Sequence, residues 1–137
     1  MTTIDLELAQ ELQSVCKEKG IELPDHYWGW FYQEITESNI LLPMFTNTLS
    51  EYLAPAYTLD ELLEWLPEYI QIDDGDDKND FDVYYRGLNW SIDPDGWVAE
   101  YKAYMYHSNS YITEFDPNPA NAACKLLIWL IKKGFIK

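Results

Sequence analysis

Apolar residues recur at spacings of three and four between residues 3 and 19, which is the pattern of one face of an α-helix. Gly20 follows this stretch, and glycine commonly ends a helix because it adopts a left-handed backbone without steric cost. Pro24 prevents simple continuation of the helix, and residues 27–35 are rich in aromatic side chains that favour strands. The pattern therefore predicts a helix over 3–19 and a strand over 27–35. The apolar helix positions are Ile4, Leu8, Leu12, Val15 and Cys16.

Residues 36–57 show no regular period, and Pro43 and Pro55 interrupt them. We predict an irregular segment there, with one turn of helix. The stretch "AYTLDELLEWLP" that overlaps its end carries the clearest local signal. Thr58 and Glu61 stand at the two positions of a capping box, in which each side chain accepts a hydrogen bond from the other residue's backbone. A short helix follows, and docking of its leucines must stabilise it because propensity alone does not. These leucines are Leu59, Leu62, Leu63 and Leu66.

From residue 81 the period changes to two, which is typical of strands. Apolar positions change phase at Arg86–Gly87, so we predict a β-bulge that brings both halves of the strand to one face. The sequence "DPDG" at 93–96 has the residue types of a turn. The pattern thus predicts a hairpin of strands 81–92 and 97–107. A second turn at 108–110 and the stretch "YITEF" add a further strand.

The last segment, "NPANAACKLLIWLIKKG", predicts a helix over 119–133. Asn118 is a suitable N-cap, Pro119 fits the first helical position, and Gly134 fits the end. Its unbroken apolar run covers only residues 126–131, whereas a membrane span needs about 20 residues. A helix this apolar on most sides belongs in the middle of a core, although a partner-binding tail has the same pattern.

These elements predict one α+β domain over residues 1–137, in which an antiparallel β-meander of three to four strands packs against N-terminal, central and C-terminal helices. An apolar fraction of 47% is sufficient for a proper core.

The net charge of the chain restricts the kinds of molecule that it can bind. The chain has 24 Asp and Glu residues against nine Lys and Arg, giving a net charge of −15. Direct binding to nucleic acid or to an anionic membrane is therefore disfavoured, and a basic protein partner or a cation is favoured. Acidity of this kind also serves solubility alone. The composition is compatible with a homo-oligomer as well as with a monomer.

No motif in the chain is diagnostic of chemistry. Cys16 and Cys124 lack metal-knuckle spacing and fit buried thiols, although a bridge between them is compatible with the sequence. His26 and His107 have no zinc-site spacing, and no P-loop, nucleophile elbow or dinucleotide fingerprint is present. The acidic stretch at 73–80 lacks the glutamate of an EF-hand, which leaves a solvated loop or weak loop-type calcium binding. We therefore predict no catalytic residue, no metal site and no cofactor.

The N-terminus has no basic region followed by an apolar one, which argues against secretion. We expect a cytoplasmic protein with reduced thiols.

Several segments together resemble a family of small uncharacterised proteins from bacteria and their phages. The shared order is an "LAxxL" helix, a Gly-Ile-x-x-Pro stretch with aromatics, a "TLxELxxW" helix, a β-hairpin and a closing helix that begins with Pro. The resemblance implies a fold and a phage or mobile-element setting, with no assigned activity. The residues that carry it are Leu8, Ala9, Leu12, Gly20, Ile21, Pro24, Thr58, Leu59, Glu61, Leu62, Trp65, Asn118, Pro119 and Ala122. This chain departs from the pattern in its acidic 73–80 stretch and in Asn-Pro where Thr-Pro is usual.

The predicted function is that of a non-catalytic, acidic protein-interaction domain. Two alternatives stay open: a nucleic-acid mimic that inhibits a host protein, and a small-molecule-binding module or enzyme with a pocket near the Tyr/His107 cluster. The polar face of the meander is the predicted interaction surface, since tyrosine-rich surfaces suit protein contacts. Packing of that face under another segment is the competing interpretation. The candidate residues are Tyr84, Glu100, Tyr104, Tyr106 and His107.

Overall fold

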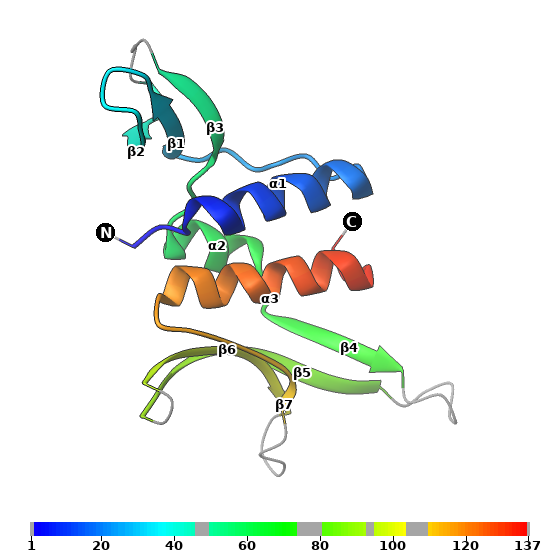
Figure 1. Cartoon of the computed structure of the whole chain (residues 1–137). Helices are drawn as coiled ribbons and strands as arrows, with labels where there is room; N and C mark the ends of the chain where they lie inside the picture. Colours follow the sequence, from blue (N-terminus) through cyan, green and yellow to red (C-terminus); the bar gives the residue numbers. More distant parts are fainter. Residues whose placement is uncertain (1, 46–49, 74–80, 93–94, 104–109, 137) are drawn as a thin grey trace.

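The computed structural model describes residues 2–45, 50–73, 81–92, 95–103 and 110–136, and it arranges them as three helices between two antiparallel sheets (Figure 1). The helices are α1 (Leu6–Lys19), α2 (Leu59–Trp65) and α3 (Pro119–Lys133). A small sheet has the strand order β2-β1-β3, from β1 (Trp28–Gln33), β2 (Ser38–Pro43) and β3 (Glu51–Pro55). A larger sheet has the order β4-β5-β6-β7, from β4 (Tyr69–Asp73), β5 (Phe81–Ser91), β6 (Gly96–Ala103) and β7 (Ser110–Asp116). The α+β prediction is confirmed.

The helix ends follow the capping residues in the sequence. Thr58 Oγ1 accepts from the Glu61 N–H (3.3 Å), and Glu61 Oε1 accepts from the Thr58 N–H (2.9 Å), which is the predicted capping box. Gly20 and Gly134 end α1 and α3 in the left-handed region, at φ 69° and 84°. Helix α1 begins later than predicted because Thr3 forms an extended bridge with Thr58 instead of a helical turn.

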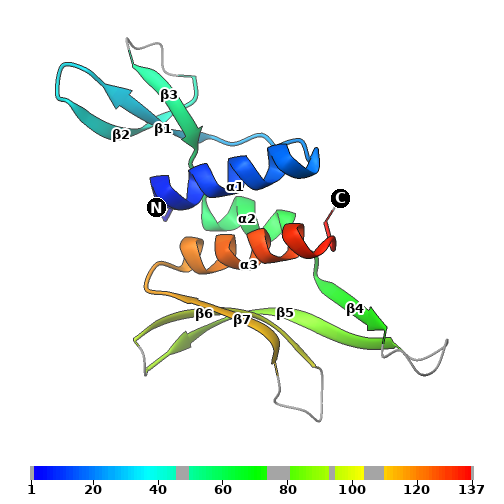
Figure 2. The ribbon, with the colours of Figure 1, turned by 45° about the vertical axis from the view of Figure 1, so that its right-hand side comes forward.

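Helix α3 is the centre of the core. It packs against α1 and α2 on one side and against β6 and β7 on the other, as Figures 1 and 2 show. This confirms the core prediction for 119–133 and excludes a free tail. Its fully buried residues include Leu126, Leu127, Leu130 and Ile131.

The larger sheet is the predicted meander, extended at its start by β4, which the sequence pattern did not reveal. The predicted β-bulge at Arg86–Gly87 is wrong, because β5 pairs with β6 without a register shift from Tyr84 to Ser91. Arg86 instead occupies an inward position in a regular strand. Its guanidinium donates to the carbonyl oxygens of Leu63 and Leu66, the latter at 2.9 Å, and so satisfies the last turn of α2.

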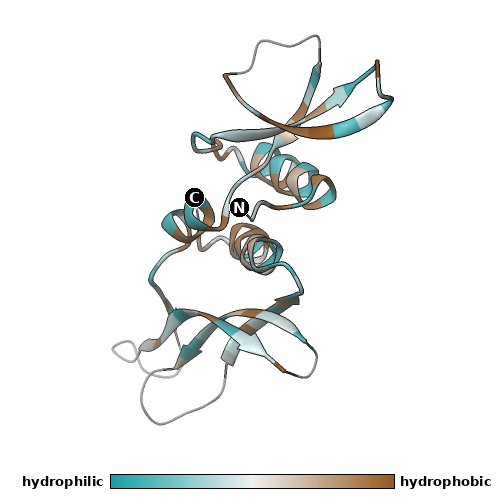
Figure 3. Cartoon of the chain, turned by 90° about the vertical axis from the view of Figure 1, so that its left-hand side faces the viewer, coloured by the Kyte–Doolittle hydropathy of each residue, from teal (hydrophilic) through white to brown (hydrophobic). Residues whose placement is uncertain are grey.

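The prediction of an irregular segment over 36–57 is corrected, because the described residues of this range contain β2 and β3. Pro43 and Pro55 favour an irregular segment in the sequence pattern because proline is rare in strands. Each is the last residue of an edge strand, where a missing N–H costs no ladder hydrogen bond. Figure 3 shows the resulting small sheet at the opposite end of the molecule from the larger one.

Some predictions concern residues outside the described part of the chain. The acidic stretch at 74–80, positions 93–94 of the "DPDG" turn, and residues 104–109, which include the end of the predicted 97–107 strand and most of the 108–110 turn, lie outside the described residues.

Candidate functional site: the outer face of the small sheet

The residues of the predicted interaction surface do not share one face. Tyr84 is partly buried against the core, with its ring centroid 5.0 Å from that of Tyr111. Glu100 pairs with Gly87, an odd number of residues from Tyr84, so strand alternation places it on the other face of the sheet. There Glu100 is 9% exposed and accepts a hydrogen bond from Asn89 (3.1 Å). The remaining candidates, Tyr104, Tyr106 and His107, lie outside the described residues.

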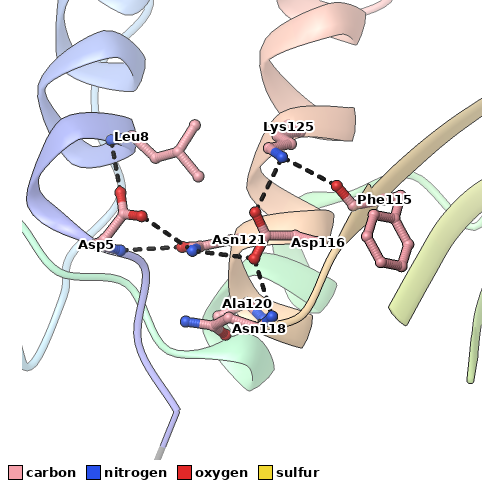
Figure 4. Close-up of polar contacts among 8 residues, drawn as sticks. All are labelled: Asp5, Leu8, Phe115, Asp116, Asn118, Ala120, Asn121 and Lys125. Carbon is pink, nitrogen blue, oxygen red and sulfur yellow. Dashed lines mark hydrogen bonds and ion pairs between the residues drawn. The ribbon is translucent and has the colours of Figure 1, made fainter. Parts of the chain in front are cut away.

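A polar cluster joins the start of α1 to the start of α3 (Figure 4). Asn121 Nδ2 donates to Asp5 Oδ2 (3.0 Å) and to Asp116 Oδ1 (3.3 Å), and Asn121 Oδ1 accepts from the Asp5 N–H (3.0 Å). Lys125 Nζ lies 2.9 Å from Asp116 Oδ2 and donates to the Phe115 carbonyl at 2.9 Å. The cluster thus links residues more than a hundred positions apart.

This cluster is structural. Burial acts to raise the pKa of Asp116, but hydrogen bonds from the Asn118 N–H, Lys125 and Asn121, with the Lys125 charge, lower that pKa below its ordinary value. In the part of the chain that the structure describes, no buried side-chain nitrogen or oxygen lacks a hydrogen-bond partner. The hydrogen bonds of the cluster are thus made within the protein, between the starts of α1 and α3 and the end of β7.

The two cysteines are free and buried, not bridged. Burial raises the pKa of Cys16 to about 11, and burial together with nearby carboxylates also raises the pKa of Cys124. Both thiols are therefore protonated at neutral pH, whereas a nucleophilic cysteine requires the thiolate.

The described residues contain neither a metal-ligating cluster nor a helix that could span a membrane. No group of three or more His, Cys, Asp and Glu side chains there is placed to hold a metal ion. No helix among them has the length and apolar character that crossing a membrane requires.

The small sheet is fixed to the helices by its inner face. Trp30 Nε1 donates to the Ile4 carbonyl (3.0 Å), and Trp30 packs against the main core. The Tyr27 N–H donates to Glu61 Oε2 (3.2 Å), so the capping glutamate of α2 also holds the start of β1. The Ala56 N–H donates to the Trp28 carbonyl (2.9 Å). Contacts with Ile4 before α1 and with the capping glutamate of α2 thus hold this sheet against the helices.

The opposite face of this sheet, here called the outer face, carries its own apolar cluster. Phe31 is buried but is not part of the main core, and its ring centroid lies 5.5 Å from that of Tyr52. Side chains converge over Gly29, where an added Cβ would lie 2.7 Å from Met44 Sδ and 3.1 Å from the Tyr52 ring. Strand register and ring contacts assign seven residues to the outer face: Tyr27, Phe31, Ile40, Leu42, Met44, Phe45 and Tyr52.

This face is accessible to a partner. Tyr27 is 50% exposed and Phe45 is 74% exposed, and their ring centroids lie 5.5 Å apart. Met44 and Tyr52 are 38% and 39% exposed. Large apolar side chains gathered in this way are typical of interaction sites.

A chain of rings leads from the outer face to an acidic groove beside α2. Tyr52 Oη lies 3.1 Å from His26 Nε2, and the His26 ring lies 5.2 Å from that of Tyr57, which in turn is 5.6 Å from Trp65. Tyr57 donates to the Pro24 carbonyl (2.5 Å), and burial, followed by neighbouring negative groups, raises its pKa, so it stays a neutral donor. The groove has a volume of about 350 Å³ and is lined by Pro24, Asp25, Tyr57, Glu61, Glu64 and Trp65.

Charge is distributed unevenly between this end of the molecule and the rest. Residues 20–73 contain ten of the 24 acidic residues and none of the nine Lys and Arg. Eight of these ten are exposed. The small sheet and α2 therefore form an end rich in carboxylates, here called the anionic end, with no Lys or Arg of its own; Arg86 of β5 contacts it at the last turn of α2. The exposed acidic residues are Glu22, Asp25, Glu34, Glu37, Glu51, Asp60, Glu64 and Glu68.

Sequence reasoning missed this site although it had one signal for it. The net charge of −15 does not locate the carboxylates, whereas the uninterrupted absence of Lys and Arg from 20 to 73 marks the anionic end in the sequence itself. The outer face could not be recognised, because it requires β2, which was predicted as irregular.

Comparisons with protein-family models, with curated proteins and with solved structures find no match for this chain. The family resemblance and its phage or mobile-element setting therefore stay predictions.

Proposed function

We propose that this chain is a non-catalytic protein-interaction domain that binds a basic partner protein through the outer face and the acidic groove. One observation carries the proposal: exposed aromatic side chains of the small sheet gather at an end whose own segment, residues 20–73, contains ten carboxylates and no Lys or Arg.

The two properties of this end have complementary roles in binding. Aromatic side chains such as Tyr27 and Tyr52 bury much area at low entropic cost and supply affinity at interface centres. The surrounding carboxylates steer a basic partner to the site and disfavour acidic ones. Asp25 and Glu64 fit this role because both are exposed at the groove, whereas Glu61 is already engaged by Thr58 and Tyr27.

The test is a binding measurement with matched charge changes. The double variant Asp25→Asn with Glu64→Gln removes two charges from the groove, and Glu7→Gln with Glu18→Gln removes two exposed charges from α1. With an oligolysine probe of about 20 residues, we expect the groove variant to weaken binding at least about fivefold, or roughly 1 kcal/mol, and the α1 variant to change it much less. Equal losses in the two variants would show attraction by net charge alone and would contradict the proposal.

The charge segregation also favours a second candidate, a nucleic-acid mimic that occupies a nucleic-acid-binding protein. Such a mimic replaces phosphates by carboxylates, so its complex dissociates steeply with salt and is indifferent to Tyr52→Ala. Our proposal expects the reverse: modest salt dependence and a strong loss with Tyr52→Ala. Capture of partners from a bacterial lysate, followed by a salt titration of wild type and Tyr52→Ala, separates the two.

A further inference from the structure

We propose that the free edge of β2 receives an extended, basic segment of the partner protein as an additional strand of the small sheet. This inference rests on the proposed function and specifies how the partner binds. Among the described residues, no strand pairs with the second edge of β2, which is the outermost strand in the order β2-β1-β3.

The register identifies the backbone groups that are available. The Met44 N–H donates to the Tyr27 carbonyl (2.8 Å), which makes this pair a hydrogen-bonded one. Such pairs alternate along an antiparallel ladder, so Leu42 and Ile40 also bond to β1. The N–H and C=O groups of Asn39 and Leu41 then point away from β1, toward an added strand. Pro43 belongs to the same outward set, which explains why it is accommodated there.

This edge has few of the features that usually block strand addition. Natural edges are protected by charged side chains, by proline, by bulges or by a covering element, and of these β2 has Pro43, at its last residue. Strand β2, Ser38–Pro43, has no charged residue and pairs with β1 without a register shift. The other edge strand, β3, has a register shift opposite Trp30 and Phe31 and packs against α1. The β2 edge is therefore the better template.

Charge complementarity selects the occupant. A strand added to β2 lies at the anionic end, with Glu34 and Glu37 exposed in the turn before the strand. A second copy of this chain would bring ten further carboxylates from residues 20–73 and no cation against the first ten, which disfavours self-pairing. A segment in which Lys or Arg alternates with β-branched residues can form hydrogen bonds with the edge of β2 and bring positive charge to the carboxylates of the anionic end.

The experiment uses the full chain and an octapeptide of alternating Lys and Val as the probe. Asn39→Pro removes the outward N–H from an exposed edge position, and Asn39→Ala removes the same side chain while keeping that N–H. We expect the Ala variant to bind the peptide like wild type and the Pro variant to bind at least about tenfold more weakly, since proline cannot donate to a ladder. Thermal melts of both variants check that the fold is retained.

Amide hydrogen exchange of the wild-type protein provides a readout that is independent of folding of the Pro variant. On addition of the peptide, we expect new protection at Asn39 and Leu41 and little change at Ile40 and Leu42, whose amides already bond to β1. Equal peptide binding by the Pro and Ala variants, or protection confined to other residues, would overturn the edge inference and leave the proposed function standing. A wild-type dimer in sedimentation that Asn39→Pro dissociates would overturn the basic occupant. Failure of all basic probes to bind would reject both proposals.

Discussion

The two sheets of this molecule have the same antiparallel pairing but differ in how their apolar side chains lie against the helical layer. The larger sheet turns Ala99 and Tyr101 inward, 2% and 0% exposed, against the helical layer. The small sheet attaches by Trp30 and keeps a second apolar cluster of its own at the surface. The larger sheet thus supplies much of the core, although it also exposes Tyr69, Tyr85 and Trp90, and the small sheet adds an apolar cluster that lies apart from that core.

Electrostatics follows the same division. The described ion pairs, Lys125–Asp116 and Lys132–Glu11, join α3 to β7 and α1. Arg86 of the larger sheet donates a hydrogen bond to the Leu66 carbonyl at the end of α2. The small sheet has no cation with which to neutralise its carboxylates internally. Substitutions in the core and substitutions in the outer face can therefore be tested separately.

Among single substitutions, a large loss of stability is expected from Leu130→Ala in α3. Leu130 lies in the core and is 0% exposed to solvent, so its truncation to alanine leaves a cavity that costs about 2–5 kcal/mol. A domain of this size has only about 5–15 kcal/mol of unfolding free energy in total. Denaturant unfolding should show a large shift of the midpoint in a single cooperative transition.

Deleting residues 119–137 extends this test and should unfold the protein, since the deleted segment includes the whole of α3. A truncated chain that melts cooperatively near the wild-type temperature would contradict the placement of α3 at the centre of the core.

A smaller loss is expected from Arg86→Met. The substitution keeps an apolar stem but leaves the Leu63 and Leu66 carbonyls without their guanidinium donor, which costs about 1–3 kcal/mol. Chemical denaturation measures the change, with Lys102→Met as the control because Lys102 is an exposed cation of the same sheet. Equal effects of the two substitutions would show that Arg86 has no special role at the end of α2.

Asp116→Asn tests the polar cluster through pH. Because hydrogen bonds and Lys125 lower the folded-state pKa of Asp116, its carboxylate stabilises the fold above the unfolded-state pKa of about 4. This contribution is lost as the pH falls through the lower folded-state value. The variant should lose about 1–2 kcal/mol at pH 7 and should show a correspondingly weaker loss of stability between pH 5 and pH 2. Parallel pH profiles of wild type and variant would contradict this assignment.

Much of the fold was predictable because local chemistry decides it. Thr58 with Glu61, Asn118 with Pro119, and the two helix-ending glycines fixed helix positions that packing then kept. The period of two likewise identified β5 and β6.

The errors share a physical cause: each depended on a contact distant in the sequence. A charged residue such as Arg86 is expected on the solvent side of a strand, and this expectation led to the prediction of a bulge. Arg86 lies on the inward side of a regular strand because two carbonyl oxygens of α2 accept hydrogen bonds from it. Pro43 and Pro55 appeared to break strands because nothing local shows that a strand lies at an edge. The outer face depends on both prolines being placed correctly, so it was missed with them.

The smallest effect on stability, and the sharpest test of the division between the sheets, is expected from Ile40→Thr. Ile40 pairs with Phe31 on the outer face and is only partly buried, and threonine keeps the β-branched shape that suits a strand. The unfolding free energy should change by less than about 1 kcal/mol. Binding of the alternating Lys and Val peptide should nevertheless weaken severalfold, because the polar hydroxyl replaces an apolar contact beside the added strand. Ile128→Thr in α3 is the same substitution at a position that is only 4% exposed, and it should instead lower the unfolding free energy strongly. If the two threonine variants lose stability equally, the small sheet is part of the cooperative core and its outer face is not a separate recognition surface.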